Sequence, residues 1–203
     1  MAELLKTVLH ERHTALGATM VDFGGWHMPI QYRTGIVEEH LATRKSAGLF
    51  DVSHMGRFIV RGPGALPLLQ HVLSNNAAAL DTGFAHYTMI PKVGGGALDD
   101  AYLYRFTPDE YLLVVNAANR EADWNYLHSH LADFPGSQMV DVSEEMAMIS
   151  LQGPSARAIL KEAVTGGVLP ETIKNAIGAV TVAGRKILVA RTGYTGEPLG
   201  FEC

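Results

Sequence analysis

Apolar side chains recur along this chain at two spacings, one typical of helices and one typical of strands. Steps of three and four residues predict helices at 35–47, 63–73, 119–131 and 155–163. Short apolar or alternating runs predict strands at 57–61, 86–90, 98–106, 110–116 and 146–152. Two further strands, 179–182 and 186–191, are close enough to form a hairpin through Ala183 and Gly184.

The order of these elements bears on the fold class. Strands outnumber helices, and several neighbouring strands are near enough in sequence to pair as hairpins. This pattern favours an α+β fold over a doubly wound parallel sheet. Because we find no linker that would divide the chain, we expect one domain over 1–203, with 165–178 as its loosest connection.

Length and composition are those of a soluble globular protein. The chain has 203 residues, of which 47% are hydrophobic and 18% charged, enough to bury a core. A formal net charge of −5 gives no long-range attraction to nucleic acid or to an anionic membrane. No apolar run approaches the roughly 20 residues of a membrane span, and the N-terminus lacks a secretion signal. We therefore expect a cytoplasmic protein that binds neither nucleic acid nor membrane.

Cysteine and histidine usage argues against disulfides and metal sites. The single cysteine is Cys203, so an internal disulfide or thiolate cluster is impossible, and we expect an exposed thiol rather than a nucleophile. The nine histidines are scattered, and His128 and His130 are two residues apart, the wrong step for one helical face. Neither a Walker loop nor a G-x-G-x-x-G motif is present, so nucleotide cofactors have no support.

Two adjacent aspartates, Asp99 and Asp100, follow three glycines and open the predicted strand 98–106. Side chains alternate between the faces of a strand, so Asp99 shares a face with Leu103 while Asp100 shares the other with Tyr102. The two carboxylates therefore do not form an acid/base pair. A carboxylate buried near tyrosines would have a tuned pKa, whereas a pair that only caps a glycine turn would not, and the residues leave both readings open.

A second polar segment contains Asp51, Ser53 and His54, the residue types of a hydrolase triad. They are too close in sequence to surround a scissile bond, and the serine lacks a nucleophile elbow. We expect instead a turn stabilised by the side chains of Asp51 and Ser53. The thioether of Met55 suits an apolar pocket for a ring system, with core filling as the alternative.

Two further places carry groups suited to a heteroaromatic ligand. Asn116 closes the predicted strand 110–116, and its amide either reads a ring edge or caps the next helix. The final segment, GYTGEPLGFEC, holds Tyr194, Glu197 and Glu202 around a glycine-rich turn. A carboxylate there accepts two parallel N–H bonds from an edge such as that of a pterin, beside a tyrosine. Such a loop needs packed structure on both sides, so we expect the front part of a longer protein.

Six segments, in order from about Leu9 to Glu202, resemble those of one family. They are DFGGWHMP with Gln31-Tyr32, LFDVSHMG, GGGALDD, VVNAAN, LQGP and RTGYTGE. Together they are similar to the glycine cleavage system T protein, a tetrahydrofolate-dependent aminomethyltransferase. One such segment would be a weak signal, but six in the family order are a strong one.

The resemblance implies a fold and a reaction. The family fold is a three-domain ring with folate in its central hole, and this chain would supply most of the first, folate-binding α+β domain. The family transfers a one-carbon unit from the aminomethyl-lipoyl arm of the H protein to tetrahydrofolate, with release of ammonia. We therefore expect tetrahydrofolate as co-substrate, the lipoylated H protein as partner, no metal, and an isolated fragment that is not a competent catalyst.

The resemblance also implies site residues. The second aspartate of the family pair is the catalytic carboxylate, here Asp100, near the N5/N10 edge of the folate. Folate-binding positions correspond to Met55, Tyr87, Asn116, Tyr194 and Glu202. The chain departs from the family at Pro198-Leu199, where a single Asp is common, and the extra residue shifts Glu202 relative to the family pattern. The family's later arginines, which clamp the glutamate tail of the folate, are absent from these 203 residues.

Two other functions use the same scaffold. Folate-dependent demethylases of methylamine or sulfonium substrates are the main alternative within the enzyme class. Folate-dependent proteins that assist iron–sulfur assembly are a binding-module alternative. Their characteristic loop carries a cysteine after lysine and glycine, whereas this chain has Arg191-Thr192-Gly193-Tyr194, which argues against that reading.

Overall fold

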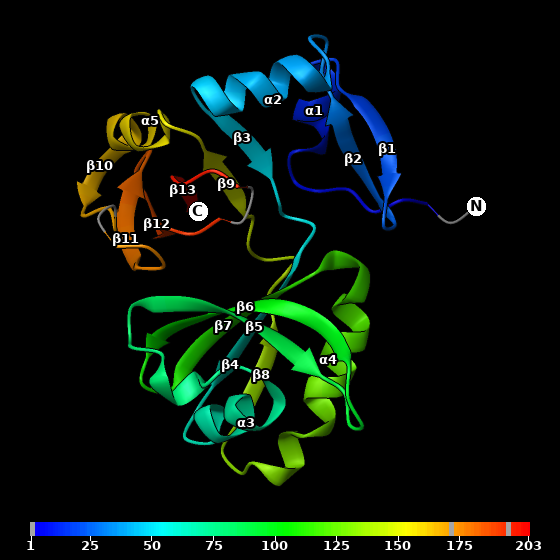
Figure 1. The fold of residues 1–203 in the computed structure, drawn as a ribbon, viewed down its shortest axis with the longest axis vertical. Coiled ribbons are helices and arrows are strands. Elements are labelled where there is room, and N and C mark those ends of the chain that lie inside the picture. The colour runs from blue at the N-terminus through cyan, green and yellow to red at the C-terminus, as the bar shows by residue number, and fades with distance from the viewer. Residues whose placement is uncertain (1–2, 171–172, 194–195) are drawn as a thin grey trace. The chain divides into compact units, whose positions relative to one another are not determined.

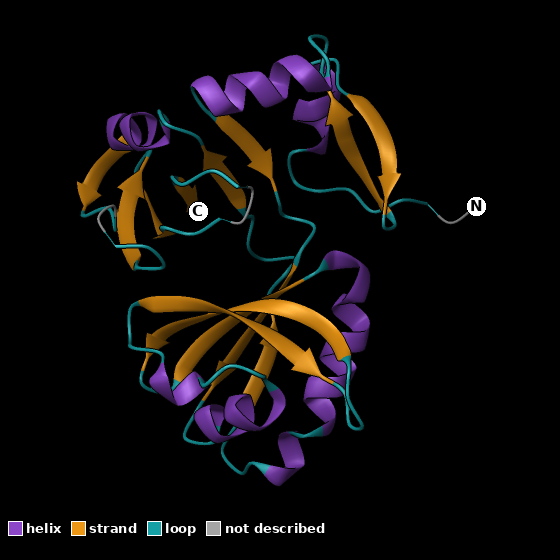
Figure 2. Cartoon of the chain, viewed as in Figure 1, coloured by secondary structure: helices purple, strands orange, loops and turns teal. Residues whose placement is uncertain are grey.

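The computed structural model describes residues 3–170, 173–193 and 196–203. The chain forms two compact units, unit 1 from Met1–His54 with Ala147–Cys203 and unit 2 from Met55–Met146 (Figure 1). Both units combine helices with sheets, which confirms the predicted α+β class (Figure 2). The chain thus passes between units at His54/Met55 and at Met146/Ala147, two places that no composition change marks.

Unit 2 is built on a five-stranded antiparallel sheet. The strand order is β5-β6-β7-β4-β8. The strands are β4 (Gly56–Arg61), β5 (Phe84–Pro91), β6 (Ala97–Thr107), β7 (Glu110–Val115) and β8 (Gln138–Asp141). Four of them, β4 to β7, confirm predicted strands, and the short β8 had no clear apolar alternation to predict it.

Helices cover one face of the unit 2 sheet (Figure 1). The helical segments of unit 2 are α3 (Ala65–Val72), α4 (Arg120–Ser129) and the 3₁₀ turns η1 (Ala77–Ala79), η2 (Ala117–Asn119) and η3 (Leu131–Asp133). Leu69 of α3 and Leu127 of α4 pack with Phe58, Leu103 and Leu113 of the sheet in one buried cluster. Strand alternation explains the set, because Leu103 faces the helices while Tyr102 and Tyr104 face the other way.

Unit 1 contains a six-stranded sheet and a separate two-stranded hairpin. The sheet order is β10-β11-β12-β13-β9-β3, and the hairpin pairs β1 with β2. The strands are β1 (Thr19–Phe23), β2 (Trp26–Gln31), β3 (Gly48–Asp51), β9 (Ile149–Gln152), β10 (Val164–Gly167), β11 (Ile177–Val182), β12 (Arg185–Ala190) and β13 (Gly200–Glu202). The helices are α1 (His10–Ala15), α2 (Ile36–Lys45) and α5 (Ala156–Ala163).

The core of the six-stranded sheet explains the position of α5. Leu160 of this helix is buried with Leu151, Val180, Val189 and Phe201 from four different strands. The predicted hairpin of β11 and β12 is confirmed, and Ala183 and Gly184 at its turn have φ values of 48° and 76°. Two central residues with positive φ are what a two-residue hairpin turn requires.

Several predicted bounds differ from the structure. The helix expected at 35–47 ends at Lys45, and the next strand, β3, starts at Gly48. The strand expected at 146–152 begins only at Ile149. The connection expected at 165–178 contains most of β10, which pairs with β11. The hairpin β1-β2 was not predicted, because its exposed side chains do not alternate regularly between apolar and polar.

Candidate functional site

The register of the unit 2 sheet brings distant residues to one of its ends. Val115 of β7 pairs with Ala101 of β6 on one side and with Gly56 of β4 on the other. One step further along, Asp100 and Met55 are therefore the neighbours of Asn116 in the two adjacent strands. Three of the predicted site residues meet here although up to 61 positions separate them in sequence (116 − 55).

The side-chain amide of Asn116 joins both aspartates of the Asp-Asp pair. Its Nδ2 donates to Oδ1 of Asp99 at 2.9 Å and to Oδ1 of Asp100 at 2.8 Å. Its backbone N–H donates to Oδ2 of Asp99 at 3.4 Å. Asn116 makes no capping hydrogen bond to the η2 turn that follows. Asn116 does occupy the N-cap position of η2, but its side-chain amide does not cap that turn and instead ties two strands together.

Tyr87 of β5 completes this cluster. It pairs with Tyr102 across the β5–β6 ladder, and its hydroxyl is hydrogen-bonded to Asp100. Partial desolvation, together with the hydrogen bond and the negative charge of Asp100, raises the pKa of Tyr87. Tyr87 therefore stays a neutral donor at physiological pH. We define the "amide cluster" as Tyr87, Asp99, Asp100 and Asn116.

The two aspartates occupy different environments. Asp100 is exposed beside the buried rings of Tyr102 and Tyr104, whereas Asp99 is half-buried on the face that the helices cover. Burial raises the pKa of Asp99, but hydrogen bonds from Asn116, Asp123 and Asn119 outweigh it and leave the pKa below its usual value. Hydrogen bonds therefore lower the pKa of Asp99, the aspartate on the helix-covered face.

The sequence prediction missed one residue of this region, Asp123 on α4. It is 0% exposed, in the same layer as Leu127 one helical turn later. Burial and the neighbouring Asp99 raise the pKa of Asp123 to about 8. A signal existed in the sequence, because the i, i+4 spacing places an aspartate on the apolar face of the predicted helix 119–131.

Asp51 and Ser53 form the turn that the sequence predicts. The backbone N–H of Ser53 donates to Oδ1 of Asp51 at 3.0 Å. Oδ2 of Asp51 lies 3.0 Å from Nε2 of His13, whose Nδ1 lies 2.7 Å from the hydroxyl of Tyr32. Burial raises the pKa of Asp51, but hydrogen bonds from Thr7, His13 and Ser53 outweigh it and lower the pKa below its usual value.

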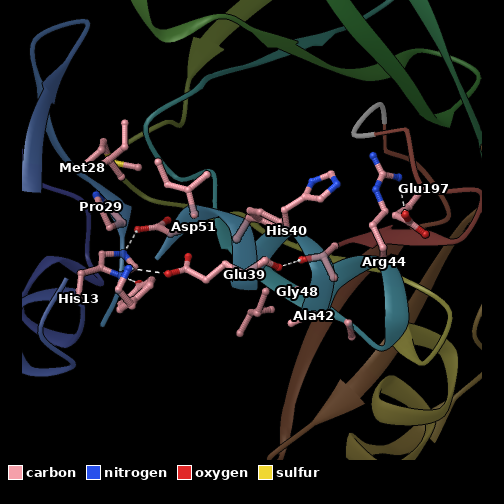
Figure 3. Close-up of a pocket in the computed structure, with 17 residues that line it drawn as sticks. His13, Met28, Pro29, Glu39, His40, Ala42, Arg44, Gly48, Asp51 and Glu197 are labelled. Carbon is pink, nitrogen blue, oxygen red and sulfur yellow. Dashed lines mark hydrogen bonds and ion pairs between the residues drawn. The ribbon is translucent and has the colours of Figure 1, made fainter. Parts of the chain in front are cut away.

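A cavity of about 570 Å³ opens beside this group in unit 1 (Figure 3). Its polar side chains bind one another: His13 contacts Asp51 at one end, and Arg44 forms an ion pair with Glu197 at the other. Glu197, one of the carboxylates considered for a pterin edge, lines this cavity but is paired with Arg44, and no residue that the resemblance assigns to folate is among the described lining residues. We therefore treat its hydrogen bonds as structural.

The remaining predicted residues lie in unit 1 or outside the described residues. Glu202 of β13 is 8% exposed, and the hydroxyl of Thr192 donates to its Oε2. Tyr194 lies outside the described residues. Cys203 is half-buried, and burial raises the pKa of its thiol to about 11, so the expected exposed thiol is wrong. The described part of the chain contains no group of three His, Cys, Asp or Glu arranged for a metal and no helix that could span a membrane.

A family model described as the GCVT N-terminal domain matches residues 9–203. The chain belongs to this family. Curated relatives that match it are named aminomethyltransferase. One from Thermus thermophilus is 50% identical over 197 residues, which are 97% of this chain and 55% of the relative. One from Prosthecochloris aestuarii is 46% identical over 192 residues, which are 95% of this chain and 53% of the relative.

One solved structure supports the same family, and another shares only the fold. The glycine cleavage system aminomethyltransferase T from Bartonella henselae matches with a TM-score of 0.83 at 35% identity, over 98% of this chain and 53% of that one. A heterotetrameric sarcosine oxidase from Corynebacterium matches with a TM-score of 0.56 at 21% identity, over 79% of this chain and 78% of that one, which shows a shared fold alone. The chain spans about half the length of the curated relatives that it matches.

Proposed function

We propose that this chain is the folate-binding N-terminal part of an aminomethyltransferase of the glycine cleavage system. The complete protein would move a one-carbon unit from the aminomethyl-lipoyl arm of the H protein to tetrahydrofolate and release ammonia. Relatives with this name cover almost all of the chain at about half identity. The lipoylated H protein as donor, tetrahydrofolate as co-substrate and a cytoplasmic location belong to the same proposal.

The observation that carries this proposal is the amide cluster. Resemblance to the family assigns Tyr87, Asp100 and Asn116 to folate, and these residues come from β5, β6 and the end of β7. Their side chains contact one another directly, with Asn116 Nδ2 at 2.8 Å from Asp100 Oδ1. Sequence similarity alone does not require these contacts. Their presence supports a shared role for the three side chains.

The proposed reaction exchanges bonds at one carbon. The C–N bond to ammonia and the C–S bond to the lipoyl sulfur break, and bonds to N5 and N10 of the folate form. The two folate N–H protons end on the lipoyl thiol and on ammonia, so the step needs no oxidant or reductant. A carboxylate at Asp100 would accept a proton from the attacking amine and stabilise positive charge that develops on the carbon. Its exposure leaves it accessible to a ring.

Tyr87 and Asn116 would hold this carboxylate rather than react. Both donate hydrogen bonds to Asp100, and neither donor changes charge near neutral pH because the pKa of Tyr87 is raised. A carboxylate that accepts from two neutral donors is held in one orientation. The Asp100 side chain is therefore suited to act as an oriented proton acceptor.

Replacing Asp100 by Asn tests the proposal. We expect the rate of tetrahydrofolate-dependent ammonia release from aminomethylated H protein to fall by about 10²- to 10⁴-fold. A positioned general acid or base typically contributes this factor to the rate. Folate affinity should stay close to that of the wild type, because the amide keeps the shape of the side chain. The assay uses the complete protein that contains these 203 residues.

Asp81→Asn is the matched control, because Asp81 is an exposed aspartate in the turn before β5. It should leave both transfer and folate affinity unchanged. Undiminished transfer by the Asp100→Asn variant would refute the assignment of Asp100. Transfer from a methylamine or sulfonium donor in place of the H protein would refute the proposed donor.

A further inference from the structure

The carboxyl group of Asp123 lies fully buried inside unit 2. The residue is 0% exposed, and within the described residues neither of its oxygens accepts a hydrogen bond from an N–H or hydroxyl group. An ionised carboxylate in such a place loses its hydration and gains nothing in return. Protonation removes that cost, so the side chain is best satisfied as a neutral carboxylic acid that donates a hydrogen bond.

Asp99 is the acceptor within reach. Asp123 and Asp99 share a hydrogen bond, and Asp99 also accepts from Asn116 Nδ2 at 2.9 Å. Two ionised carboxylates would repel at this contact, whereas one acid and one carboxylate attract. The pKa shifts of the two residues agree with this arrangement. Burial and Asp99 raise the pKa of Asp123 to about 8, while the donors around Asp99 lower the pKa of Asp99 despite burial. Two carboxyl groups with pKa values pushed apart take opposite protonation states.

The amide of Asn116 connects this pair to the exposed side of the sheet. Carboxylates only accept, so Nδ2 of Asn116 must face Asp99 and Asp100, and it donates to one carboxylate oxygen of each, with the carbonyl of Asp100 a further acceptor at 3.4 Å. A continuous chain of hydrogen bonds therefore runs from Asp123 through Asp99 and Asn116 to Asp100. Every link in it is made within unit 2.

We propose that Asp123 is a positioning residue whose carboxylic acid proton holds Asp99, and through Asp99 and Asn116 fixes the orientation of Asp100. The proposal rests on the proposed function, in which Asp100 is the reacting carboxylate. Nothing in the arrangement requires Asp123 to contact substrate, because α4 and the inner face of the sheet enclose it.

Other charged groups near α4 are occupied with different partners. Arg120 on the same helix pairs with Asp141 of β8 at 2.9 Å and with Glu144 at 3.0 Å. Arg57 of β4 donates to the carbonyl of Met55 at 2.9 Å. His128 of α4 lies against Trp124. These groups leave Asp99 and Asp100 as the charges that act on Asp123, together with burial.

Tyr111 of β7 also lies on the helix-covered face, and burial raises its pKa. His86 of β5 is another titratable group on that face, since it pairs with Leu103. Burial lowers its pKa below the usual 6.5, so it is neutral above pH 7. It does not titrate where Asp123 does. Loss of the Asp123 proton at alkaline pH would place three carboxylates around one amide, and the amide cluster should then open.

The side-chain amide of Asn116 reports this event directly. We expect its proton and nitrogen chemical shifts, recorded by NMR on the 203-residue chain, to titrate with a midpoint near pH 8. In Asp123→Asn the titration should vanish while the pH 7 shifts stay close to wild type, because the new amide still donates to Asp99. In Asp123→Leu, which lacks a donor, the signals should be displaced at every pH.

Glu121→Gln is the matched control, an exposed carboxylate on the same helix, and it should keep the wild-type titration. The inference is overturned if the wild-type amide does not titrate between about pH 6 and 10, if Asp123→Asn retains the titration, or if Glu121→Gln removes it. Asp123→Asn keeps the test decisive even where Asp123→Leu does not fold.

A second measurement separates this inference from the proposed function. In the complete protein, the transfer rate should decline above about pH 8 in the wild type and lose that decline in Asp123→Asn. If Asp100→Asn leaves transfer intact, the proposed function fails while the NMR titration still stands. If the amide does not titrate but Asp100→Asn abolishes transfer, only the role of Asp123 fails.

Discussion

At the scale of single residues, unit 2 places three aspartates in three electrostatic states. Asp100 is exposed, Asp99 is half-buried among donors, and Asp123 is fully buried beside another carboxyl group. The composition counts each of the three aspartates as one negative charge, but the environment of each side chain determines whether it is ionised. The formal net charge of −5 therefore overstates the negative charge of the folded chain at neutral pH by the proton on Asp123.

The proton on Asp123 predicts an unusual pH dependence of stability. Its folded pKa of about 8 lies above the unfolded value of 3.8, so between these values the folded state holds one more proton. The free energy of unfolding should then fall as pH rises from about 4 to about 8, by up to about 1.4 kcal/mol per pH unit. Urea denaturation of wild type and Asp123→Asn across this range measures it.

The difference in the free energy of unfolding between wild type and Asp123→Asn isolates the contribution of the Asp123 proton. His86 and Asp51, which do not contact Asp123, contribute to both proteins alike. We expect the free energy of unfolding of Asp123→Asn, relative to that of the wild type, to increase steadily as pH rises from 4 to 8. A constant difference between the two curves from pH 4 to 8 would contradict a buried neutral acid at this position.

At the scale of elements, hydrogen bonds attach the short helix α1 to unit 1. Among the described residues of α1, His13 is the buried one, and it reaches Tyr32 just after β2 and Asp51 at the end of β3. A helix of six residues is too short to be stable by itself. Tertiary contacts of His13, together with the hydrogen bond between His10 and His27 of β2, therefore explain why the helix forms here.

Replacing His13 by Ala tests this attachment. The change leaves the buried carboxylate of Asp51 short of one partner, which should lower the free energy of unfolding by about 1–3 kcal/mol. His40→Ala is the control, because His40 is exposed on α2. Chemical denaturation of both variants at neutral pH gives the comparison. An equal effect of the two changes would show that the His13 contacts do not stabilise the chain.

At the scale of the whole molecule, the two units differ in how the chain builds them. Unit 2 is one continuous segment, Met55–Met146, with its own sheet, helices and buried cluster. Unit 1 needs two segments that are far apart in sequence. The amide cluster and Asp123 both belong to the continuous unit. The chain of hydrogen bonds from Asp123 to Asp100 therefore forms without the two separate segments of unit 1.

Excision of residues 55–146 tests whether unit 2 is independent. We expect the segment to fold alone, with a dispersed amide spectrum and a single cooperative thermal transition. The Asn116 amide should keep the shifts that it has in the whole chain. Leu113→Ala, at a core position that is 0% exposed, should destabilise the segment by about 2–5 kcal/mol. A collapsed spectrum of the excised wild-type segment would show that unit 1 is needed.

The α+β class, most strands of unit 2 and the closing hairpin could be predicted from the amino-acid order, because alternation and turn residues are local signals. Resemblance pointed to Tyr87, Asp100 and Asn116. The folded chain was needed to show that Asn116 bridges both aspartates, that Asp99 is half-buried among donors, and that His13 meets Asp51. Register and burial create these contacts, and neither can be read from neighbours in the chain.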